Sequence, residues 1–466
     1  MTKPQHIAVI DIGKTNAKLA LVDFESLTEV AVVTRPNVVQ SGPPWPHYDI
    51  DGHWAFLLDA LATFHRDHRI DAISITTHGA CAALLAVDGS LAAPILDYEH
   101  EYPADIVAAY DAIKPDFAET GSPRMVGGLN IGAQLHYQYA TDPTLRDRTA
   151  KIVTYPQFWG HRLTGIAATD VTSLGCHTDL WNPHTGTFSD LPATLGIADK
   201  IAPVRHPSDI LGPILPQIAQ ATGLAPDTPV CVGIHDSNAS LYPHVISRNE
   251  PTSVVSTGTW VIAMSLMGED ASIIPHLDPN RDTLINVNAR GQAVPSARFM
   301  GGREYEIIQN GLPYAPTEQD IAAVLDQSLM LLPSVETGTG PFQNRTMEWL
   351  DREPPVGSGQ RAVALSFYLA LMTGTCLDLI EARGPTIVEG PFARNAEFIA
   401  MLKAITDRPV VTSEAATGTS IGAALLFNTD QTLPIPADAV NSEVGKEFSA
   451  FMDRWRTSVR SLMQPD

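Results

Sequence analysis

Two stretches of the chain, Val9-Ile10-Asp11-Ile12-Gly13-Lys14-Thr15-Asn16-Ala17-Lys18 and Val254-Val255-Ser256-Thr257-Gly258-Thr259-Trp260, decide its fold. Each starts as an apolar strand, passes through a tip rich in glycine and hydroxyl groups, and continues as a second apolar run. The pattern predicts two β-hairpins. Glycine lets a backbone approach a phosphate closely, so two such hairpins far apart in sequence are typical of a clamp for a nucleoside triphosphate. Taken alone, each is equally an ordinary polar turn.

The residues of the two tips are candidate ligands for the nucleotide. Asp11 ends its strand and can hold a hydrated Mg²⁺ against the phosphates, since that ion usually keeps several waters. The sequence contains no GxxxxGK[ST] stretch, which excludes a P-loop fold. The candidate phosphate-binding residues are Asp11, Gly13, Lys14, Thr15, Asn16, Lys18, Thr257, Gly258 and Thr259.

A third signal is the segment Gly233-Ile234-His235-Asp236-Ser237, which overlaps the end of a predicted buried strand at 229–234 and continues beyond it. A carboxylate at a strand end can accept the proton of a substrate hydroxyl as its oxygen attacks a γ-phosphorus. Asp236 is therefore the candidate general base, and it is also a candidate Mg²⁺ ligand. The alternative is that Asp236 only caps a helix starting near Ala239.

His78 and Gly79 stand at the end of another predicted strand, residues 70–76. A histidine in that place can hydrogen-bond a sugar hydroxyl. The alternative is a core histidine whose ring nitrogens are satisfied inside the protein.

Composition restricts the class of protein. A chain of 466 residues is too long for one core of usual size and predicts two domains. Its formal net charge of −22 disfavours nucleic acid and anionic membrane as partners. The four cysteines show no CxxC spacing, and no apolar run reaches the ~20 residues of a membrane span. The start of the chain leads straight into a strand, and we expect a cytoplasmic protein.

The order of predicted elements indicates an α/β fold in both halves. A polar break at 247–251 suggests a boundary there, and each half begins with a glycine-tipped hairpin. We expect a hairpin over 80–97 turning at Asp88-Gly89, and a largely helical insertion over 100–150. Further strands are expected at 7–13, 17–23, 386–388 and 410–412, a strand and hairpin at 252–266, and helices at 53–64, 317–330, 360–382, 396–405 and 421–427.

The last predicted helix, 443–463, carries one apolar face. It either packs back on the body of the protein or contacts a second copy in a homodimer. The face consists of Phe448, Phe451, Met452, Trp455, Val459 and Leu462.

Together these motifs resemble, in order and over nearly the whole chain, those of the FGGY family of carbohydrate kinases. The segments that carry the resemblance are 11–16, 76–79 with 85–89, 163–165 with Thr169-Asp170, 233–236 and 258–259. Within the family, the segments 235–237 and 256–260 look most like the rhamnulokinase and fuculokinase branch.

The resemblance implies two ribonuclease-H-like domains of the actin-like ATPase superfamily, 1–246 and 247–466, with a central cleft. It implies a sugar kinase that uses ATP and Mg²⁺ and phosphorylates a ketose, such as the 6-deoxy ketohexoses L-rhamnulose or L-fuculose. Asp236 would be the catalytic base. The sugar would contact His78, Gly79, His235 and Asp236, with Asn288 or Arg303 reaching sugar or phosphate. Gly390 and Asn395 would join the nucleotide site.

The chain departs from the family pattern in three places, one of them Ala400, where the family often has a glutamine shortly after the adenine-site motif. The region after the sugar-site hairpin reads Leu96-Asp97-Tyr98-Glu99-His100 instead of Trp-x-Asp-x-Arg, and the adenine-site motif begins Gly390-Pro391 instead of Gly-Gly. Xylulose and ribulose kinases are the near alternatives. A non-catalytic sugar or nucleotide sensor on the same fold is another, which loss of Asp11 or Asp236 would have favoured. An ATPase of the actin or chaperone type, with a protein client, is the third.

Overall fold

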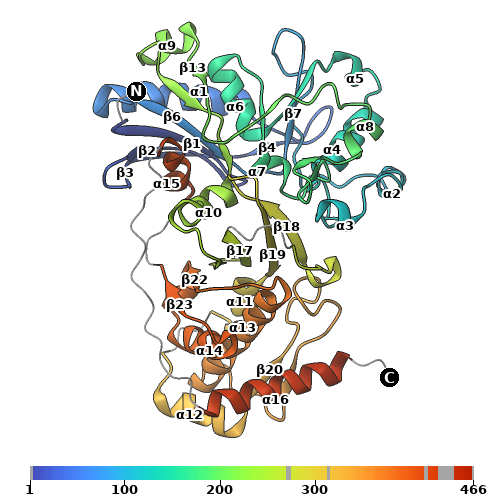
Figure 1. The fold of residues 1–466 in the computed structure, drawn as a ribbon, viewed down its shortest axis with the longest axis vertical. Coiled ribbons are helices and arrows are strands. Elements are labelled where there is room, and N and C mark those ends of the chain that lie inside the picture. Colours follow the sequence, from blue (N-terminus) through green and yellow to red (C-terminus); the bar gives the residue numbers. More distant parts are fainter. Residues whose placement is uncertain (1–3, 269–273, 312–314, 414–417, 429–445, 464–466) are drawn as a thin grey trace. The chain divides into compact units, whose positions relative to one another are not determined.

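The structure, a computed structural model, describes residues 4–268, 274–311, 315–413, 418–428 and 446–463, apart from the side chains of 446, 447, 462 and 463. The described chain divides into two compact units (Figure 1). Unit 1 takes the described residues within Met1–Ser247, Ile285–Ala293 and Thr417–Leu433, and unit 2 takes the others. The first division falls at the polar break after Ser247, and two later segments return to unit 1, which a single cut at 246 does not include.

Unit 1 is built on a seven-stranded mixed sheet in the order β13-β14-β6-β1-β2-β3, with β15 also paired to β6. β1 and β6 run parallel, whereas β1 and β2 form the predicted first hairpin. The strands are β1 (His6–Ile12), β2 (Asn16–Asp23), β3 (Thr28–Pro36), β6 (Ala72–Thr77), β13 (Ile210–Pro213), β14 (Pro229–Cys231) and β15 (Ile234–His235).

Alternating residues of these strands cover the two faces of the sheet. Ile10 and Leu19 are register partners and lie in one core with Leu57 of α1 (Ile50–His68) and Phe158 of α6 (Tyr155–Thr164). On the other face, the Ser74 hydroxyl donates to the carbonyl of Ala423 in α15 (Thr419–Ala424) at 2.6 Å. Full burial of an aliphatic side chain such as Ile10, Leu19 or Leu57 contributes roughly 1.5–3 kcal/mol to the stability of the fold. The expected helix over 421–427 is thus confirmed and belongs to the first unit.

The hairpin expected over 80–97 forms only next to its turn, where Leu85 and Leu91 make an isolated antiparallel bridge and the Ala92 amide donates to the Leu84 carbonyl at 2.8 Å. The turn itself exists, because Gly89 has a φ of +83° and the amide of Ala86 donates to the carbonyl of Ser90 at 2.8 Å. However, β7 (Ala82–Leu85) pairs along its length with the distant β8 (Lys151–Thr154). Helical elements fill the intervening insertion as expected: α2 (Ala104–Asp111), α3 (Phe117–Thr120), α4 (Ile131–Thr141) and α5 (Leu145–Arg148).

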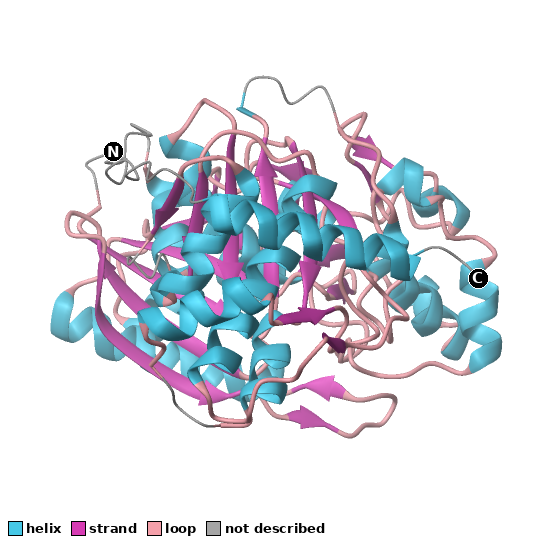
Figure 2. Ribbon diagram, turned by 90° about the horizontal axis from the view of Figure 1, so that it is seen from below, coloured by secondary structure: helices cyan, strands magenta, loops and turns pink. Residues whose placement is uncertain are grey.

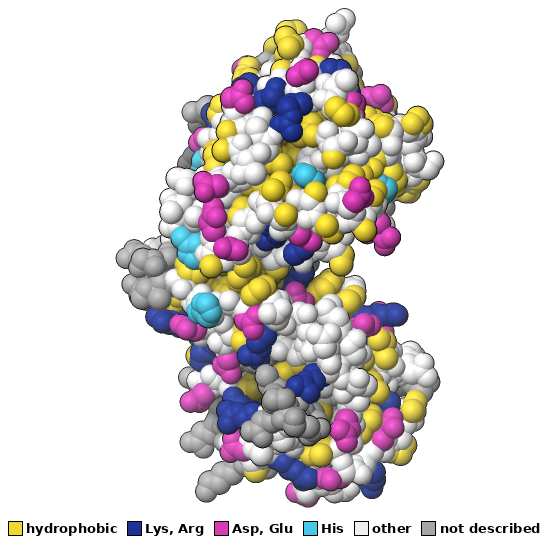
Figure 3. Space-filling view, turned by 90° about the vertical axis from the view of Figure 1, so that its right-hand side faces the viewer, with side chains coloured by type: hydrophobic (Ala, Val, Ile, Leu, Met, Phe, Trp, Pro, Cys, Tyr) yellow, Lys and Arg dark blue, Asp and Glu magenta, His cyan; other side chains and the backbone are white. Residues whose placement is uncertain are grey.

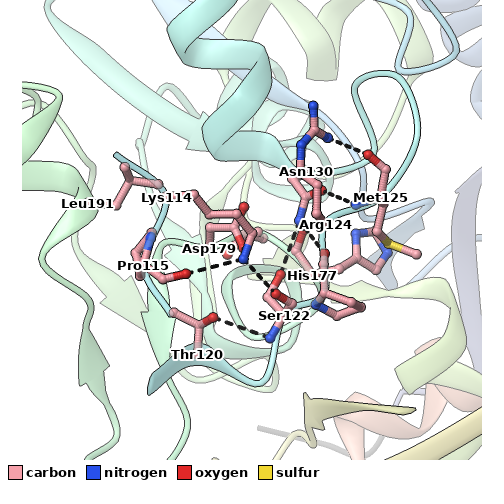
Figure 4. Close-up of polar contacts among 12 residues, drawn as sticks. Lys114, Pro115, Thr120, Ser122, Arg124, Met125, Asn130, His177, Asp179 and Leu191 are labelled. Carbon is pink, nitrogen blue, oxygen red and sulfur yellow. Dashed lines mark hydrogen bonds and ion pairs between the residues drawn. The ribbon is translucent and has the colours of Figure 1, made fainter. Parts of the chain in front are cut away.

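A buried polar cluster ties this insertion together (Figure 4). The Lys114 ammonium lies 3.3 Å from Asp179, whose side chain is fully buried, and donates to the carbonyl of Ser122 at 3.0 Å. Asn130 donates to the carbonyls of Pro123 and His177, at 3.1 and 3.2 Å. Burial raises the pKa of Asp179, and the Lys114 charge opposes that rise. Loss of one member of such a pair typically costs 3–5 kcal/mol, because a charge is left buried without its partner.

Unit 2 is built on a sheet in the order β18-β19-β17-β16-β22-β23. β16 and β17 form the second predicted hairpin, and β22 runs parallel to β16. The strands are β16 (Thr252–Thr257), β17 (Val261–Leu266), β18 (Thr283–Val287), β19 (Ala293–Phe299), β22 (Thr386–Glu389) and β23 (Val410–Thr412).

Three helices of unit 2 correspond to expected ones: α12 (Glu318–Gln327), α13 (Gly359–Leu379) and α14 (Ala396–Thr406). A fourth, α11 (Gly301–Gln309), was not expected. Figure 2 shows helices in front of the strands in this view. Gly374 lets α13 approach α14, because a Cβ there would lie 2.6 Å from Ile405. By length and composition α13 also qualifies as a candidate membrane span, but 83% of its apolar window is buried, as in the core helix of a folded domain.

The terminal helix α16 (Lys446–Met463) packs on unit 2. Phe451, Met452, Trp455 and Val459 are buried, and the Trp455 indole donates to the carbonyl of Leu331 at 3.0 Å. The side chain of Leu462 lies outside the described residues. The apolar face of α16 therefore packs against other residues of the same chain. On the face of the molecule shown in Figure 3, the described acidic and basic side chains are interspersed.

Glu304 makes the stability of unit 2 depend on pH. Its carboxylate is fully buried and accepts hydrogen bonds from the Glu336 amide at 3.1 Å and the Tyr368 hydroxyl at 3.0 Å. Burial raises its pKa from 4.5 to about 7. A raised folded-state pKa means that stability is fully present below about pH 4.5 and is lost as the pH rises through about 7.

We expect Glu304→Gln to remove about 3 kcal/mol of pH dependence from the free energy of unfolding, measured by urea denaturation across that window. The matched control is Glu306→Gln, on the exposed side of the same helix. Identical pH profiles for the two variants would contradict the assignment.

Candidate active site

Three strands of unit 1 bring the predicted site residues to one edge of the sheet. β1, β6 and β15 are parallel, with Ile12 opposite Thr77 and Thr77 opposite His235. Their carboxyl ends therefore meet, and the residues that end or follow them lie together. His78 and Asp236 directly follow β6 and β15, and Asp11, which we expected at the end of its strand, is the last residue but one of β1.

The first phosphate loop is held from below by buried polar side chains. The Gly13 amide donates to the Asn16 carbonyl at 2.9 Å, and the Asn37 side chain donates to the Gly13 carbonyl at 2.8 Å. His53 contacts Asn37 through Nε2 and Arg35 through Nδ1, each at 2.8 Å. Because a guanidinium only donates, Nδ1 accepts and Nε2–H donates, so the ring is neutral. Burial lowers the pKa of His53 to about 4, in agreement.

The tip of that loop is open to solvent. Thr15 and Asn16 are exposed, so their polar groups are available to a ligand. Lys18 lies on the neighbouring strand, with its ammonium 3.2 Å from Asp11 and 3.4 Å from Glu29.

Asp11 has a partner that the sequence did not reveal. The hydroxyl of Thr419, the first residue of α15, donates to its Oδ2 at 2.6 Å across 408 positions of sequence. α15 also lies close to α10 (Asp236–Ser247), since a Cβ on Gly422 would lie 1.7 Å from the Ala239 carbonyl. The small-residue run after Gly418 was the one signal that could have marked this contact.

Asp236 begins α10 directly, three residues earlier than the helix start expected near Ala239. Its Oδ1 accepts the amide of Ser237 at 2.6 Å and lies 3.2 Å from Nε2 of His235. The residue is half-buried, and burial, followed by the charge of Asp11, raises its pKa to about 7. A base is most effective when its pKa lies near the working pH. The helix-capping alternative accounts for the amide contact but not for a second carboxylate nearby.

His235 is fixed by its neighbours. Its amide donates to the Thr172 hydroxyl at 3.1 Å, and that hydroxyl donates to the fully buried Asp170 at 2.5 Å. Its Nδ1 lies 2.9 Å from the Ser237 hydroxyl. Burial lowers the pKa of His235 to about 4, so the ring is neutral at physiological pH. Asp170, which we expected only as part of a recurrent stretch, therefore supports the segment that carries Asp236.

His78 is buried, and neither ring nitrogen has a hydrogen-bond partner among the described residues. Its ring packs against Tyr155, Tyr98 and Tyr48 at centroid distances of 4.8, 5.2 and 5.4 Å. Burial lowers its pKa to about 3. Buried polar groups are nearly always satisfied, so this neutral imidazole is suited to a ligand hydroxyl. No described residue hydrogen-bonds the ring, which disagrees with the alternative of a core histidine satisfied inside the protein.

Lys14 turns toward acidic side chains that the resemblance did not anticipate. Its ammonium lies 2.5 Å from Asp97 and 2.9 Å from Glu99, and 4.6 Å from the centroid of the Tyr98 ring. The Tyr48 hydroxyl also donates to Asp97 at 2.9 Å. The departure from the family pattern at 96–100 thus has a structural consequence, because Asp97 and Glu99 form ion pairs with Lys14 of the first loop. Its role toward phosphate stays a prediction.

Unit 2 contains a pocket of about 530 Å³ at the second hairpin. Gly258 and Thr259 line it, together with Tyr305 and Phe392, whose rings lie 5.8 Å apart. Gly302 allows a close approach there, since a Cβ would lie 2.0 Å from the Gly258 carbonyl. Its size and its mixture of aromatic and polar walls are typical of small-molecule sites.

Gly390 and Thr257 form the base of this pocket. Gly390 has a φ of +84°, and the Thr257 hydroxyl donates to the Glu389 carbonyl at 2.5 Å and accepts the Phe392 amide at 3.1 Å. Pro391 begins a short 3₁₀ turn, Pro391–Arg394, where its missing N–H costs nothing. Asn395 caps α14 by accepting the Phe398 amide and donates to Ser366 at 2.9 Å.

The side chains of two other candidate residues are engaged by neighbouring groups of the protein. Asn288 is in unit 1 and is buried in the turn after β18, where its side chain accepts the amides of Arg290 and Gln292. Arg303 is in unit 2, half-exposed on α11, and is paired with Glu306 at 3.8 Å and Glu336 at 3.6 Å. Contact of either with sugar or phosphate stays a prediction.

The residues at the edge of the unit 1 sheet fit a magnesium ion. Asp11 raises the pKa of Asp236, so the two carboxylates lie close enough to repel. Mg²⁺ is commonly held by one or two carboxylates together with substrate phosphates and water. No group of three or more metal-binding side chains occurs among the described residues, so the protein itself would supply only part of the shell.

Comparison with family models gives two consecutive matches. Residues 6–242 match the model described as "FGGY family of carbohydrate kinases, N-terminal domain", and residues 249–434 match "Carbohydrate kinase FGGY, C-terminal domain". The chain belongs to the FGGY family of carbohydrate kinases. Its curated FGGY relatives include an L-fuculokinase of Salmonella typhi, 24% identical over 281 residues, which covers 58% of this chain and 59% of the relative. An L-fuculokinase of Haemophilus influenzae is 29% identical over 139 residues, 29% of each chain.

Solved structures confirm the two-domain fold of FGGY kinases, which belong to the actin-like ATPases. A carbohydrate kinase from Novosphingobium aromaticivorans is 34% identical over 99% of this chain and 100% of its own, with a TM-score of 0.90. Two others share only the fold. They are a xylulose kinase from Lactobacillus acidophilus (16% identity, 98% of each chain, TM-score 0.76) and a glycerol kinase from Plasmodium falciparum with ADP (15%, 99% of each chain, 0.78).

Proposed function

We propose that this protein transfers the γ-phosphoryl group of MgATP to a hydroxyl group of a ketose, with Asp236 as the general base. The observation that carries the proposal is the position of Asp236 at the strand edge of unit 1. There burial and the charge of Asp11 raise its pKa to about 7, and His78 directly follows the neighbouring strand with no partner for its ring among the described residues.

The chemistry follows from these groups. The Asp236 carboxylate takes the proton of the sugar hydroxyl, that oxygen forms the new bond to the γ-phosphorus, and the bond from γ-phosphorus to the β-bridging oxygen breaks to release ADP. Bound Mg²⁺ would neutralise phosphate charge. Asp11 and Asp236 would hold the ion. Thr15 and Asn16 offer donors to the phosphates, and neutral His78 and His235 can orient the sugar.

The adenosine of the nucleotide would lie in the pocket of unit 2. Tyr305 and Phe392 offer ring faces to a base, and Gly258 and Gly302 permit close backbone approach. The 3₁₀ turn that starts at Pro391 is compatible with this use, because the proline replaces a donor that no backbone contact needs.

For the acceptor we propose a 6-deoxy ketohexose such as L-fuculose or L-rhamnulose. The support is the resemblance of 235–237 and 256–260 to that branch and the naming of the curated relatives as L-fuculokinases. The aromatic walls around His78 also suit the apolar face of such a sugar. Xylulose and ribulose are the alternative acceptors. The small sugar and ATP are the only partners that we propose, and the place of action is the cytoplasm.

The test is ADP production from MgATP across L-fuculose, L-rhamnulose, xylulose, ribulose, fructose and glycerol. We expect kcat/KM for a 6-deoxy ketohexose to exceed that for the others by about tenfold or more, since one well-placed apolar contact is worth roughly 1–3 kcal/mol. A preference for xylulose or ribulose would overturn the choice of acceptor and keep the reaction. Nucleotide binding without turnover on any sugar would favour a sensor.

A further inference from the structure

A second pocket of unit 2 is lined by three arginines. It has a volume of about 340 Å³ and lies between α13, α16 and the segment before β18. Arg281, Arg456 and Arg460 line it, with Asp378 as its one acidic lining residue. It shares no lining residue with the nucleotide pocket. In a chain of net charge −22, this local excess of positive charge runs against the overall composition.

Arg281 is oriented without a direct ion pair, although the charge of Asp278 acts on it. Its guanidinium lies 5.7 Å from the centroid of the Phe342 ring, and its Nε donates to the Pro341 carbonyl at 3.2 Å. Within the described chain no acidic side chain forms an ion pair with it. Burial lowers the pKa of Arg281, which means that its charge is poorly solvated. An anion in the pocket would relieve that cost.

The other two arginines stand one turn apart on α16, next to Trp455 and Val459, which also line the pocket. Neither forms an ion pair within the described part of the chain. Arg454 of the same helix is different, because it pairs with Asp351 at 2.5 Å and does not line the pocket.

Asp378 does not cancel this charge. Besides Arg456, it faces Arg408, and both arginines lower its pKa against the rise caused by burial. The Nη1 group of Arg408 is buried without a hydrogen-bond partner among the described residues. Three lining arginines and Arg408 nearby therefore exceed the two carboxylates that act on them, Asp378 and Asp278. The Thr375 hydroxyl is already used, because it donates to the Leu371 carbonyl at 2.8 Å.

We propose that this pocket binds the phosphate group of a small phosphorylated metabolite. Guanidinium groups present paired donors that match phosphate oxygens. The volume is at the lower end of the range for small-molecule sites and suits a compact ligand. The net negative charge of the chain repels nucleic acids and anionic membranes, whose phosphate groups would otherwise be candidate ligands of such a pocket. The proposal does not depend on the identity of the sugar or on the proposed reaction.

The test is calorimetric titration of the whole protein with inorganic phosphate at constant ionic strength, with MgADP saturating to occupy the nucleotide pocket. The variant is Arg456→Gln combined with Arg460→Gln, and the matched control is Arg454→Gln on the same helix. We expect wild type and control to bind phosphate equally, and the double variant to bind about tenfold or more weakly, since each charge-assisted hydrogen bond is a strong one.

Equal phosphate affinity in all three proteins, or no phosphate binding to wild type, would overturn the proposal. Arg281→Gln provides a second variant from a different segment, and its thermal unfolding reports whether the fold persists. If it too is folded, we expect the same weakening. Unchanged affinity in folded Arg281→Gln would exclude this pocket as the phosphate site.

Discussion

Asp236→Asn is expected to lower kcat by about 10²- to 10⁴-fold, the usual contribution of a positioned general base. Asparagine can still accept the Ser237 amide at Oδ1, a contact of 2.6 Å in the native chain, so the local geometry should persist. What disappears is the group that accepts the proton. ADP production under saturating sugar and MgATP measures the effect.

The same variant should not be less stable than wild type above pH 7. The folded-state pKa of Asp236 is raised from 3.8 to about 7, so its stabilising contribution is complete below about 3.8 and is lost as the pH rises through 7. Asparagine avoids that loss and removes the repulsion from Asp11. Asp227→Asn, an exposed carboxylate of the same unit, is the control and should change neither quantity. Undiminished turnover in Asp236→Asn would remove the assignment of the base.

Gly79→Ala is expected to lower kcat/KM for the sugar by about 10²-fold, the order of loss that a displacement of about 1 Å causes in an oriented site. A Cβ on Gly79 would lie 2.3 Å from Cδ2 and 2.5 Å from Nε2 of His235. His235 cannot move freely, because Ser237 and Thr172 hold it. The ring must shift, and Asp236, next to it, shifts as well.

Steady-state kinetics with varied sugar and saturating MgATP measure this second effect. Gly338→Ala is the control, because a Cβ there meets nothing within 4 Å. Wild-type kcat/KM in folded Gly79→Ala would show that His235 has room to adapt, and that the closeness of the two residues has no part in catalysis.

The local pattern of the sequence predicted the two hairpins and the position of Asp236, the proposed base, directly after a buried strand. Strand periodicity, glycine tips and the polar residue after each buried strand are properties of short segments, and β1 with β2 and β16 with β17 formed as expected. Because parallel strands end at one edge, the grouping of Asp11, His78 and Asp236 followed from the same pattern.

Contacts between distant segments were not predictable in this way. Thr419 reaches Asp11 across 408 positions, and β7 pairs along its length with the distant β8, whereas across its own turn it makes only the bridge from Leu85 to Leu91. Both depend on tertiary packing, which one chain's periodicity does not encode. The support of Gly13 by Asn37 and His53 also joins separate segments, and no short motif announces it.

The most direct measurement of the central claim is mass spectrometry of the products formed from MgATP and L-fuculose or L-rhamnulose, by wild type and by Asp236→Asn. The account predicts a singly phosphorylated sugar and ADP in equal amounts with wild type, and almost none of either with the variant. ADP and free phosphate without phosphorylated sugar, or equal amounts of sugar phosphate from both proteins, would contradict it.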